Sequence, residues 1–494
     1  MHCTQSLVVL TAAALVPVSA FQATPLKQRV QALIDASPAA RGAFWGIRVL
    51  EAETGKVVYA RNAEKYFIPA SNTKLFSTAL ALSRLGPDHR FETKIVSRSE
   101  IDPSGRLSGD LILAGGGDPT LSPREIPYRK GDVKGDPLVA IAAMADELVA
   151  RGLRRVDGDV IGDDTAYEWE PYPAGWALDD ATWEYGAAVS ALVVNDNAFR
   201  LSVQPGAAAG EPGRIRLTPP FEFFTVHNHV RTAARGTNGR VRVRRDAGSR
   251  EIHLAGELSL GSRGTGFVLA VGDPALYAAS VLYDALVARG VGIHGRPRAR
   301  HRWKGDSVAP PEGVVLVSRK SPPLIELARV VDKVSQNLHA ELLLLEAGRV
   351  RGGEGGREAA LGQLEEFLKE IGIPPESYDF ADGSGLSRLT RVTPHKITQL
   401  LAYMFKSAHR DAWRSLMPVG GEDGTLEHRF DGEPRAKLIQ AKTGTISHVS
   451  ALSGYAESAS RGTLIFSILV NNYNSRQAEV RSVIDKISIL LTEQ

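Results

Sequence analysis

From residue 24 to residue 90, apolar and polar positions follow first a helical period, then a strand period, then a helical period again. Apolar side chains recur three and four positions apart over residues 24–36, which predicts an amphipathic helix. Residues 42–64 hold two strand-like runs around a Glu-Thr-Gly turn, and a second helix is predicted to begin near Ser71. A helix, a hairpin and a helix predict an α+β unit whose hairpin needs partner strands from elsewhere in the chain.

After Arg90 the pattern changes to short strand-like runs separated by glycine turns, and this pattern continues to about residue 163. Residues 164–255 combine aromatic and proline-rich loops with a predicted hairpin near residues 237–258. Helical periodicity returns at residues 275–290 and more clearly at 323–348. The chain therefore predicts an α+β unit interrupted by mainly β insertions, without an internal repeat of fixed period.

The last third of the chain supplies the strands that the first hairpin lacks. Residues 436–458 are predicted to form strands, and residues 462–472 form an unbroken apolar run of strand length, which is typical of a central strand covered on both faces. An amphipathic helix is predicted from Ser475 towards Leu491.

Residues 1–20 have the pattern of an export signal peptide. An apolar run from Leu7 to Val16 is followed by small residues ending at Ala20, although no Lys or Arg precedes the run. The run is too short to span a bilayer, and no later run is long enough to do so. The single cysteine, Cys3, lies within this segment. Cleavage would leave a mature chain without thiol or disulfide chemistry.

Length and charge narrow the classes of partner. A chain of 494 residues is too long for one ordinary core and suggests two or three domains. The net charge of +3, from 59 basic and 56 acidic side chains, gives no field that would favour nucleic acid or a membrane surface. The partner must therefore be inferred from local sites.

Ser71 and Lys74 form an S-x-x-K pair at the predicted helix start, directly after Pro69 and Ala70. Residues three apart share a helix face, so the lysine amine can reach the serine hydroxyl. A lysine acts as a base only when neutral, which requires burial or a second cation nearby. The alternative is a serine that caps a helix beside a solvated lysine, and the pair alone does not exclude it.

Two further motifs follow in the order that serine β-lactamases and penicillin-binding proteins share. Ser335 and Asn337 place a hydroxyl and an amide on one loop between helices. Lys442, Thr443, Gly444 and Thr445 lie at a predicted strand edge, where Gly444 leaves room for an approaching peptide. The three motifs together favour nucleophilic catalysis by Ser71 over a simple helix cap.

On these motifs the chain resembles the D-alanyl-D-alanine carboxypeptidases/endopeptidases among the low-molecular-mass penicillin-binding proteins, in the group with insertions between the first two motifs. The segments 113–122, 185–199, 380–388 and 420–426 also resemble that group. The resemblance implies a transpeptidase-like core, an antiparallel sheet flanked by helices, with two nested and mainly β inserted domains. The implied division is a signal peptide 1–20, a catalytic domain 21–90 and 319–494, an inserted domain 91–163 and 256–318, and a nested domain 164–255.

The resemblance also implies roles for the motif residues. Ser71 would be the nucleophile, Lys74 its general base, and Ser335 the relay of a proton to the leaving amine. Asn337, Lys442, Thr443, Gly444 and Thr445 would bind the substrate, with the backbone N–H groups of Ser71 and Thr445 forming the oxyanion hole. Gln336 stands in the middle of the S-x-N motif, a position that takes no part in this chemistry.

Other candidate sites have weaker support. Asp382, Ser384 and Ser387 are interpreted as a structural turn rather than as substrate contacts. His227 and His229 lack a third ligand at a typical spacing, so a surface or packing role is favoured over a metal site. The alternating Arg240, Arg242 and Arg244 are interpreted as a solvated strand face, with a contact to anionic wall polymer as the alternative.

The sequence thus predicts an exported serine D-Ala-D-Ala carboxypeptidase of the periplasm or cell-wall space, with cleavage of D-alanyl cross-links as a further activity. Its expected partners are peptidoglycan stem peptides and β-lactams, without nucleic acid, cofactor, metal or integral membrane segment. A serine β-lactamase and a penicillin-recognising sensor without turnover remain alternatives. The oligomeric state and the role of the inserted domains stay open.

Overall fold

The computed structural model describes residues 25–131, 133–309, 311–353 and 355–494. The predicted signal peptide and Cys3 lie outside the described residues. No helix in the described part of the chain combines the length and hydrophobicity that a membrane crossing requires.

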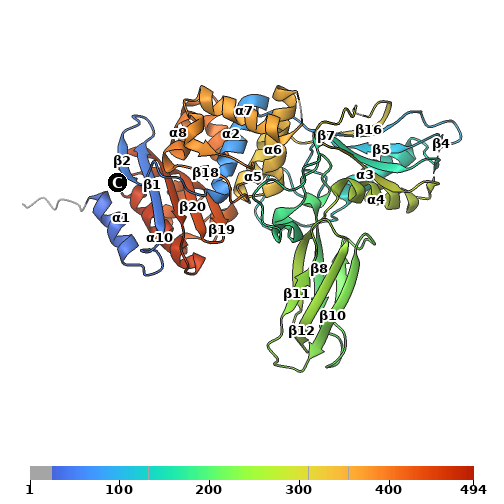
Figure 1. Ribbon diagram of the computed structural model, residues 1–494, viewed down its shortest axis with the longest axis horizontal. Helices are drawn as coiled ribbons and strands as arrows, with labels where there is room; N and C mark the ends of the chain where they lie inside the picture. The colour runs from blue at the N-terminus through green and yellow to red at the C-terminus, as the bar shows by residue number, and fades with distance from the viewer. Residues whose placement is uncertain (1–24, 132, 310, 354) are drawn as a thin grey trace, which may run out of the picture.

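The two ends of the chain build one five-stranded antiparallel sheet (Figure 1). In pairing order its strands are β19 (Ile439–Ile446), β20 (Val449–Ser458), β21 (Gly462–Asn471), β1 (Phe44–Glu51) and β2 (Val57–Arg61). The predicted apolar strand is thus β21, which lies between β20 and β1 at the centre of the sheet. Its side chains are buried from Leu464 to Val470, as expected for a strand covered on both faces.

Helices cover both faces of this sheet. On one face, α1 (Leu26–Asp35) and α10 (Gln477–Thr492) bury their apolar stripes against it. The other face carries α2 (Lys74–Leu85), α5 (Leu324–Lys333), α6 (Asn337–Gly352), α7 (Arg357–Glu370), α8 (Pro394–Lys406) and α9 (Arg410–Leu416). The short strands β17 (Tyr378–Asp379) and β18 (Arg391–Val392) pair beside this helical layer.

The helical pattern predicted over 323–348 forms two helices rather than one. The chain leaves the helix between α5 and α6, where Ser335 has φ +64°, a left-handed conformation that ends a helix. The Gln336 side chain then accepts a hydrogen bond from the Leu338 N–H and caps α6. This break separates the two helices at the position of the second motif.

A second sheet is built from the segments that flank the middle of the chain. In pairing order its strands are β15 (Pro297–Arg302), β7 (Val160–Glu168), β5 (Leu111–Ala114), β3 (Glu92–Ser97) and β16 (Val314–Lys320). The helices α3 (Val139–Ala150) and α4 (Pro274–Val287) pack with it. A small parallel sheet of β14 (Gly292–Ile293), β6 (Arg155–Val156) and β4 (Arg106–Leu107) lies next to them.

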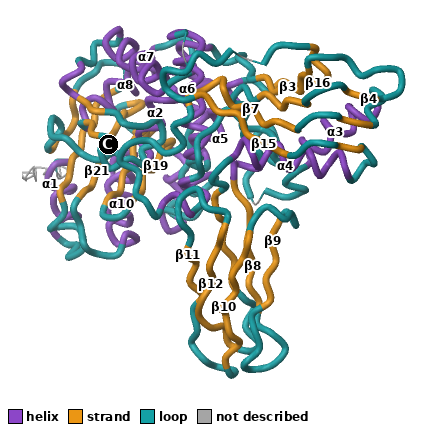
Figure 2. Tube along the Cα trace, turned by 45° about the vertical axis from the view of Figure 1, so that its right-hand side comes forward, coloured by secondary structure: helices purple, strands orange, loops and turns teal. Residues whose placement is uncertain are grey.

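The segment between β7 and α4 forms two three-stranded sheets that project away from the remaining chain (Figures 1 and 2). One contains β13 (Thr265–Ala270), β8 (Ala198–Gln204) and β9 (Arg214–Thr218). The other contains β10 (Thr225–Ala233), β12 (Glu251–Ser259) and β11 (Val241–Arg244). The predicted hairpin near residues 237–258 is the antiparallel pair of β11 and β12.

Candidate active site

Ser71 lies on a single 3₁₀ turn, Ala70–Thr73, that leads into α2, and Lys74 is the first residue of that helix. The helix has no side-chain cap, so Ser71 does not serve as its N-cap. Asn72, between the two motif residues, donates a hydrogen bond of 2.8 Å to the main-chain carbonyl of Lys442 and accepts one of 2.6 Å from Ser453. These two bonds fix the turn against β19 and β20.

Lys74 is fully buried, and its Nζ has three oxygen partners. It lies 3.0 Å from Ser71 Oγ, 2.6 Å from Asn337 Oδ1 and 2.6 Å from the carbonyl oxygen of Ser384. Burial lowers the pKa of Lys74 well below its usual value, and the positive charge of Lys442 lowers it further. Nearby carboxylates, among them Asp382, oppose this shift only in part. The arrangement therefore favours a neutral amine within reach of a serine hydroxyl.

Lys442 is the second buried cation of the site. Its Nζ donates to Ser335 Oγ at 2.9 Å and to the Thr443 carbonyl at 3.0 Å. Burial lowers the pKa of Lys442 to about 8, against the attraction of Asp332. Burial raises the pKa of the Asp332 carboxyl, although the charges of Lys442 and Lys74 oppose this shift, and Asp332 accepts a hydrogen bond of 3.2 Å from Thr78.

The break between α5 and α6 places Ser335 and Asn337 beside these lysines. Asn337 Oδ1 accepts the bond from Lys74, and its Nδ2 donates to the Tyr185 carbonyl at 2.7 Å. Because the two ends of the amide bond to opposite kinds of partner, its orientation is defined. Tyr185 belongs to the segment between β7 and β8, so that segment also contributes to the site.

The third motif lies on β19, an edge strand of the central sheet. A Cβ added to Gly444 would lie 2.6 Å from the Pro69 carbonyl oxygen and 3.2 Å from the Ser71 nitrogen, so glycine allows β19 to approach the Ser71 turn. Thr443 Oγ1 donates to Thr425 Oγ1 at 2.8 Å, and Thr445 is exposed.

A cleft of about 550 Å³ opens over this group. Five of the eight predicted residues line this cleft: Ser71, Ser335, Asn337, Thr443 and Thr445. The other three, Lys74, Lys442 and Gly444, are buried behind them. Asp180, Leu386 and Arg388 line it as well. A larger hollow, of about 760 Å³, lies beside β3 and α6 and contains none of the eight, so the smaller cleft is the candidate active site.

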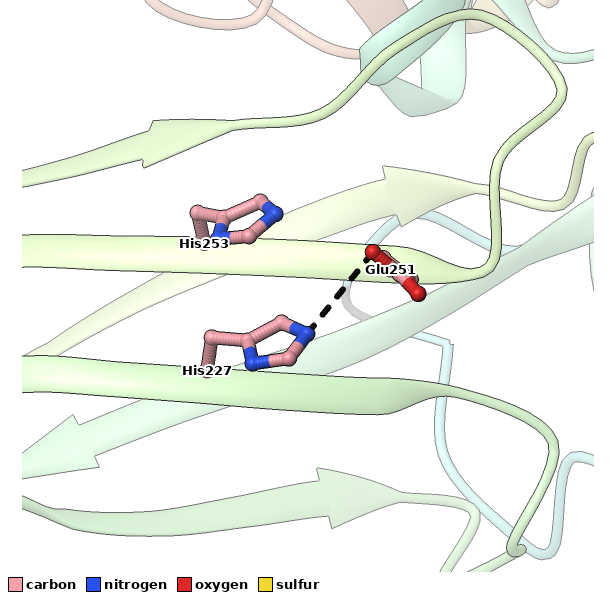
Figure 3. Close-up of side chains that lie close together, drawn as sticks. All are labelled: His227, Glu251 and His253. Carbon is pink, nitrogen blue, oxygen red and sulfur yellow. Dashed lines mark ion pairs between the residues drawn. The ribbon is translucent and has the colours of Figure 1, made fainter.

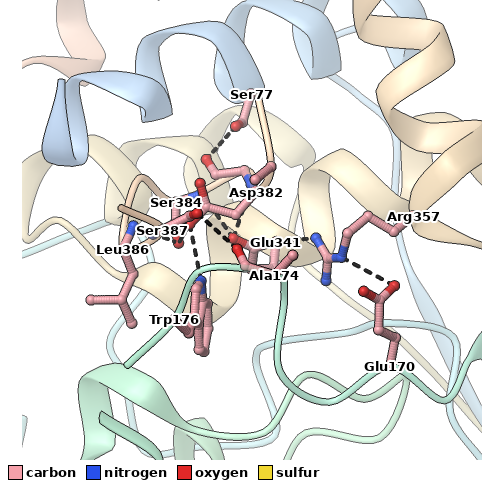
Figure 4. Close-up of polar contacts among 12 residues, drawn as sticks. Ser77, Glu170, Ala174, Trp176, Glu341, Arg357, Asp382, Ser384, Leu386 and Ser387 are labelled. Carbon is pink, nitrogen blue, oxygen red and sulfur yellow. Dashed lines mark hydrogen bonds and ion pairs between the residues drawn. The ribbon is translucent and has the colours of Figure 1, made fainter. Parts of the chain in front are cut away.

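The turn at residues 382–387 (Figure 4), predicted to be structural, also contributes to the site, because its Ser384 carbonyl accepts a hydrogen bond from Lys74. Buried Asp382 Oδ2 accepts hydrogen bonds from Trp176 Nε1 at 3.0 Å, from Ser384 Oγ at 3.0 Å and from the Ser387 N–H at 2.8 Å. These bonds fold the loop so that the Ser384 carbonyl reaches Lys74. This contact could not be predicted from the sequence, because any residue type carries a main-chain carbonyl.

Glu341 on α6 holds the same loop from the other side (Figure 4). Its Oε1 accepts the N–H groups of Gly383 at 2.9 Å and Ser384 at 2.8 Å, and its Oε2 accepts Arg357 at 2.6 Å. Burial raises the pKa of the Glu341 carboxyl even though Arg357 opposes that shift. The sequence feature that could have indicated this contact is a glutamate directly before the leucine run 342–345, where a buried charge needs a partner; Glu341 is fully buried in the fold.

Comparison with known proteins agrees with this geometry. The sequence pattern of the D-Ala-D-Ala carboxypeptidase 3 (S13) family matches residues 26–494. The chain belongs to this family. Among S13 relatives, the D-alanyl-D-alanine carboxypeptidase of Actinomadura sp. (strain R39) is 33% identical, over 97% of this chain and 87% of that protein. The D-alanyl-D-alanine carboxypeptidase DacB of Haemophilus influenzae is 24% identical, over 86% of this chain and 85% of that protein.

A solved structure confirms the fold of this S13 chain. The crystal structure of penicillin binding protein 4 (dacB) from Haemophilus influenzae superposes with a TM-score of 0.82 and 23% identity, over 94% of this chain and 99% of that one. The family resemblance and the α+β class with inserted β domains, both predicted from the sequence, are therefore confirmed. The roles of the eight site residues stay predictions.

Proposed function

We propose that the chain is a serine-type D-Ala-D-Ala carboxypeptidase that works through an acyl-enzyme on Ser71. One observation carries the proposal: Lys74 is buried, its pKa is lowered, and its Nζ lies 3.0 Å from Ser71 Oγ. A nucleophilic serine needs an adjacent base that is neutral at working pH, and this lysine meets that requirement. The name of the 33% identical relative, D-alanyl-D-alanine carboxypeptidase, supports the choice of substrate.

In the acylation step, Lys74 takes the hydroxyl proton of Ser71 as Oγ attacks the carbonyl carbon of the penultimate D-alanine. The negative charge that develops on the carbonyl oxygen is held by the backbone N–H groups of Ser71 and Thr445. Support for this oxyanion hole comes from the close approach of β19, where a Cβ on Gly444 would lie 3.2 Å from the Ser71 nitrogen.

The C–N bond then breaks, and the proton held on Lys74 passes through the Ser335 hydroxyl to the leaving nitrogen. The departing D-alanine carries a carboxylate, for which Lys442 supplies positive charge and Thr443 and Thr445 supply hydroxyl donors. Lys442 Nζ lies 2.9 Å from Ser335 Oγ. This distance supports the proposal that both side chains act at the leaving D-alanine. Asn337 keeps Lys74 oriented and offers its amide to the substrate backbone.

Release of the acyl group returns the enzyme to its starting state. Water attacks the ester carbonyl, neutral Lys74 takes a proton from that water, and the proton returns to Ser71 Oγ as the C–O bond breaks. The net reaction consumes one water molecule and yields a shortened stem peptide and free D-alanine. β-Lactams would acylate the same serine, since their strained amide presents a carbonyl and a carboxylate in a similar arrangement.

We also infer export and the domain division from the sequence. Residues 1–20 would direct the chain to the periplasm or cell-wall space. The division is a catalytic domain (21–90 and 319–494), an inserted domain (91–163 and 256–318) and a nested domain (164–255). The five-stranded sheet built by the two ends of the chain supports the catalytic part. The projecting sheets extend beyond residue 255, because β12 ends at Ser259 and β13 pairs with β8.

Mass spectrometry of the intact protein tests the proposal with two ligands. Wild type and Ser71→Ala are incubated with benzylpenicillin and then with a stem pentapeptide ending in D-Ala-D-Ala. A lasting adduct on wild type alone, with loss of one alanine from the peptide, is expected. Rapid return to the free mass with intact peptide would indicate a β-lactamase, and an adduct without peptide turnover would indicate a sensor. A cross-linked dimer of stem peptides, tested in parallel, measures endopeptidase activity.

A further inference from the structure

Three side chains on the projecting sheet of β10, β12 and β11 face one another although they are distant in the sequence (Figure 3). They are His227 on β10 and Glu251 and His253 on β12. One donor atom from each residue lies within 4.8 Å of the others. The sequence offered no third ligand for the His227–His229 pair, and the pairing of β10 with β12 supplies two.

The strand register explains why these side chains meet. β10 and β12 pair in parallel, with His227 opposite His253 and Thr225 opposite Glu251. Alternate residues of a strand share a face, so Glu251 and His253 lie side by side along β12. Ile252 and Leu254 are buried on the opposite face of the same strand, so the histidines and the glutamate are on the solvent side.

The contacts among the three residues leave ligand atoms available. The two imidazole rings stack with centroids 4.5 Å apart and planes 10° apart. His227 Nε2 lies 3.8 Å from Glu251 Oε2, too far for a hydrogen bond, and this nitrogen is buried without a hydrogen-bond partner. A buried ring nitrogen aimed at a carboxylate, without a bond to it, has an unused lone pair or proton.

We propose that His227, Glu251 and His253 form a zinc site on the nested domain. Two imidazoles and one carboxylate are a ligand set that Zn²⁺ uses, with a fourth position open to water or another ligand. Harder cations such as Mg²⁺ and Ca²⁺ prefer oxygen ligands throughout, so the two imidazoles disfavour them. The proposal is independent of the chemistry at Ser71.

The donor atoms lie close to the spacing that zinc requires. Zn–N and Zn–O bonds of about 2.1 Å in a tetrahedron place donor atoms about 3.4 Å apart. The 3.8 Å separation of His227 Nε2 and Glu251 Oε2 is already near this value, and rotation of the His253 ring, which is exposed, can bring in the third donor. The site would tie β10, an edge strand of its sheet, to the central strand β12.

One neighbouring charge opposes the ion. Arg244 on β11 lies directly opposite His253 in the antiparallel pair, so both side chains are on the same face. The positive charge of the Arg244 guanidinium would repel a divalent cation bound to His253. Its removal should therefore strengthen zinc binding, whereas removal of any ligand should weaken it.

Zinc titration of the untagged, chelator-treated full chain tests the site at neutral pH. The affinity is measured by competition with a fluorescent zinc chelator, and Co²⁺ serves as a spectroscopic probe. We expect one tight Zn²⁺ per chain and visible Co²⁺ bands of a four-coordinate site. His227→Ala, His253→Ala and Glu251→Gln should each weaken binding by about tenfold or more, a loss typical of perturbed zinc ligation.

His229→Ala is the matched control, because it removes a histidine from the same strand but not from the cluster. It should leave the affinity unchanged, and Arg244→Gln should raise it. Equal zinc binding by wild type and the triple ligand variant would overturn the proposal. So would a loss in His229→Ala equal to that in His227→Ala. Thermal unfolding of each variant reports whether the chain is folded.

Discussion

Lys74 Nζ donates a 2.6 Å hydrogen bond to the main-chain carbonyl of Ser384, a residue 310 positions away in the chain. The S-x-x-K and S-x-N motifs supply the other two oxygen partners of this amine, Ser71 and Asn337. The Ser384 carbonyl is therefore the third oxygen that positions the buried Lys74 amine. The loop that presents it is fixed by Asp382 and Glu341, neither of which belongs to a motif.

Replacing Glu341 with glutamine tests the importance of that loop. Glu341→Gln removes the carboxylate that accepts hydrogen bonds from two loop N–H groups and from Arg357. We therefore expect the free energy of unfolding to fall by about 1–3 kcal/mol. Misplacement of the loop should also slow acylation by benzylpenicillin, by up to about 100-fold. Chemical denaturation and stopped-flow acylation measure the two effects.

A pH profile separates positioning from simple destabilisation in the same variant. The negative charge of Glu341 raises the pKa of Lys74, so its removal should lower that pKa and move the acid limb of acylation to lower pH. Glu370→Gln, which breaks an exposed ion pair with Arg84, is the matched control and should cost less than about 1 kcal/mol. An unchanged acid limb in Glu341→Gln would limit its role to stability.

Lys74→Arg keeps the positive charge but removes a base that can be neutral. Because the pKa of a guanidinium stays above about 12, it cannot accept the Ser71 proton, and acylation should fall by about 10²- to 10⁴-fold. Second-order rate constants with benzylpenicillin measure this loss. Lys94→Arg, a change at a half-buried lysine paired with Glu92 and far from the site in the fold, should have no effect. A Lys74→Arg rate close to wild type would remove Lys74 from the role of base.

The alkaline limb of activity should follow Lys442. Burial lowers its pKa to about 8, so the free enzyme loses the cation that binds the terminal carboxylate as the pH rises through that value. We expect kcat/KM for a stem pentapeptide to decrease above about pH 8, since kcat/KM reports the free enzyme. Lys442→Arg should move this limb upward because arginine stays charged. A limb unchanged by Lys442→Arg would assign it to another group.

Stability should change with pH in the opposite direction. A lysine whose pKa is lower in the folded chain binds fewer protons there than in the unfolded chain between about pH 8 and pH 10.4. The free energy of unfolding should therefore rise with pH across this window, by about 1.4 kcal/mol per pH unit for each such lysine. Urea titrations of wild type and Lys442→Met would show a smaller slope in the variant. Equal slopes would contradict the lowered pKa.

The motifs and the strand periods predicted most of the architecture, because both are local signals. The central strand β21 was visible as an apolar run, and Ser71, Lys74 and Lys442 were visible by spacing. The break at Ser335 within the 323–348 pattern was less visible, since it depends on one residue with positive φ. Contacts through space could not be read from the chain: the Ser384 carbonyl at Lys74, and the Glu251 and His253 side chains beside His227.

Gly444→Ala tests how closely β19 must approach the nucleophile. An alanine Cβ at this position would meet the Pro69 carbonyl oxygen at 2.6 Å, well inside contact distance, so β19 or the Ser71 turn must move. We expect acylation to fall by about 100-fold, because a shift near 1 Å separates the two halves of the oxyanion hole.

Gly292→Ala on β14 is the control, since a Cβ there meets only the Arg154 carbonyl oxygen at 3.9 Å, an ordinary contact. Intact-mass time courses with benzylpenicillin give both rates, and thermal unfolding shows whether either variant is destabilised. A Gly444→Ala chain that unfolds like wild type but acylates slowly would locate the defect at the site. Acylation at the wild-type rate would mean that β19 does not need this approach, and the oxyanion hole would then require another second donor.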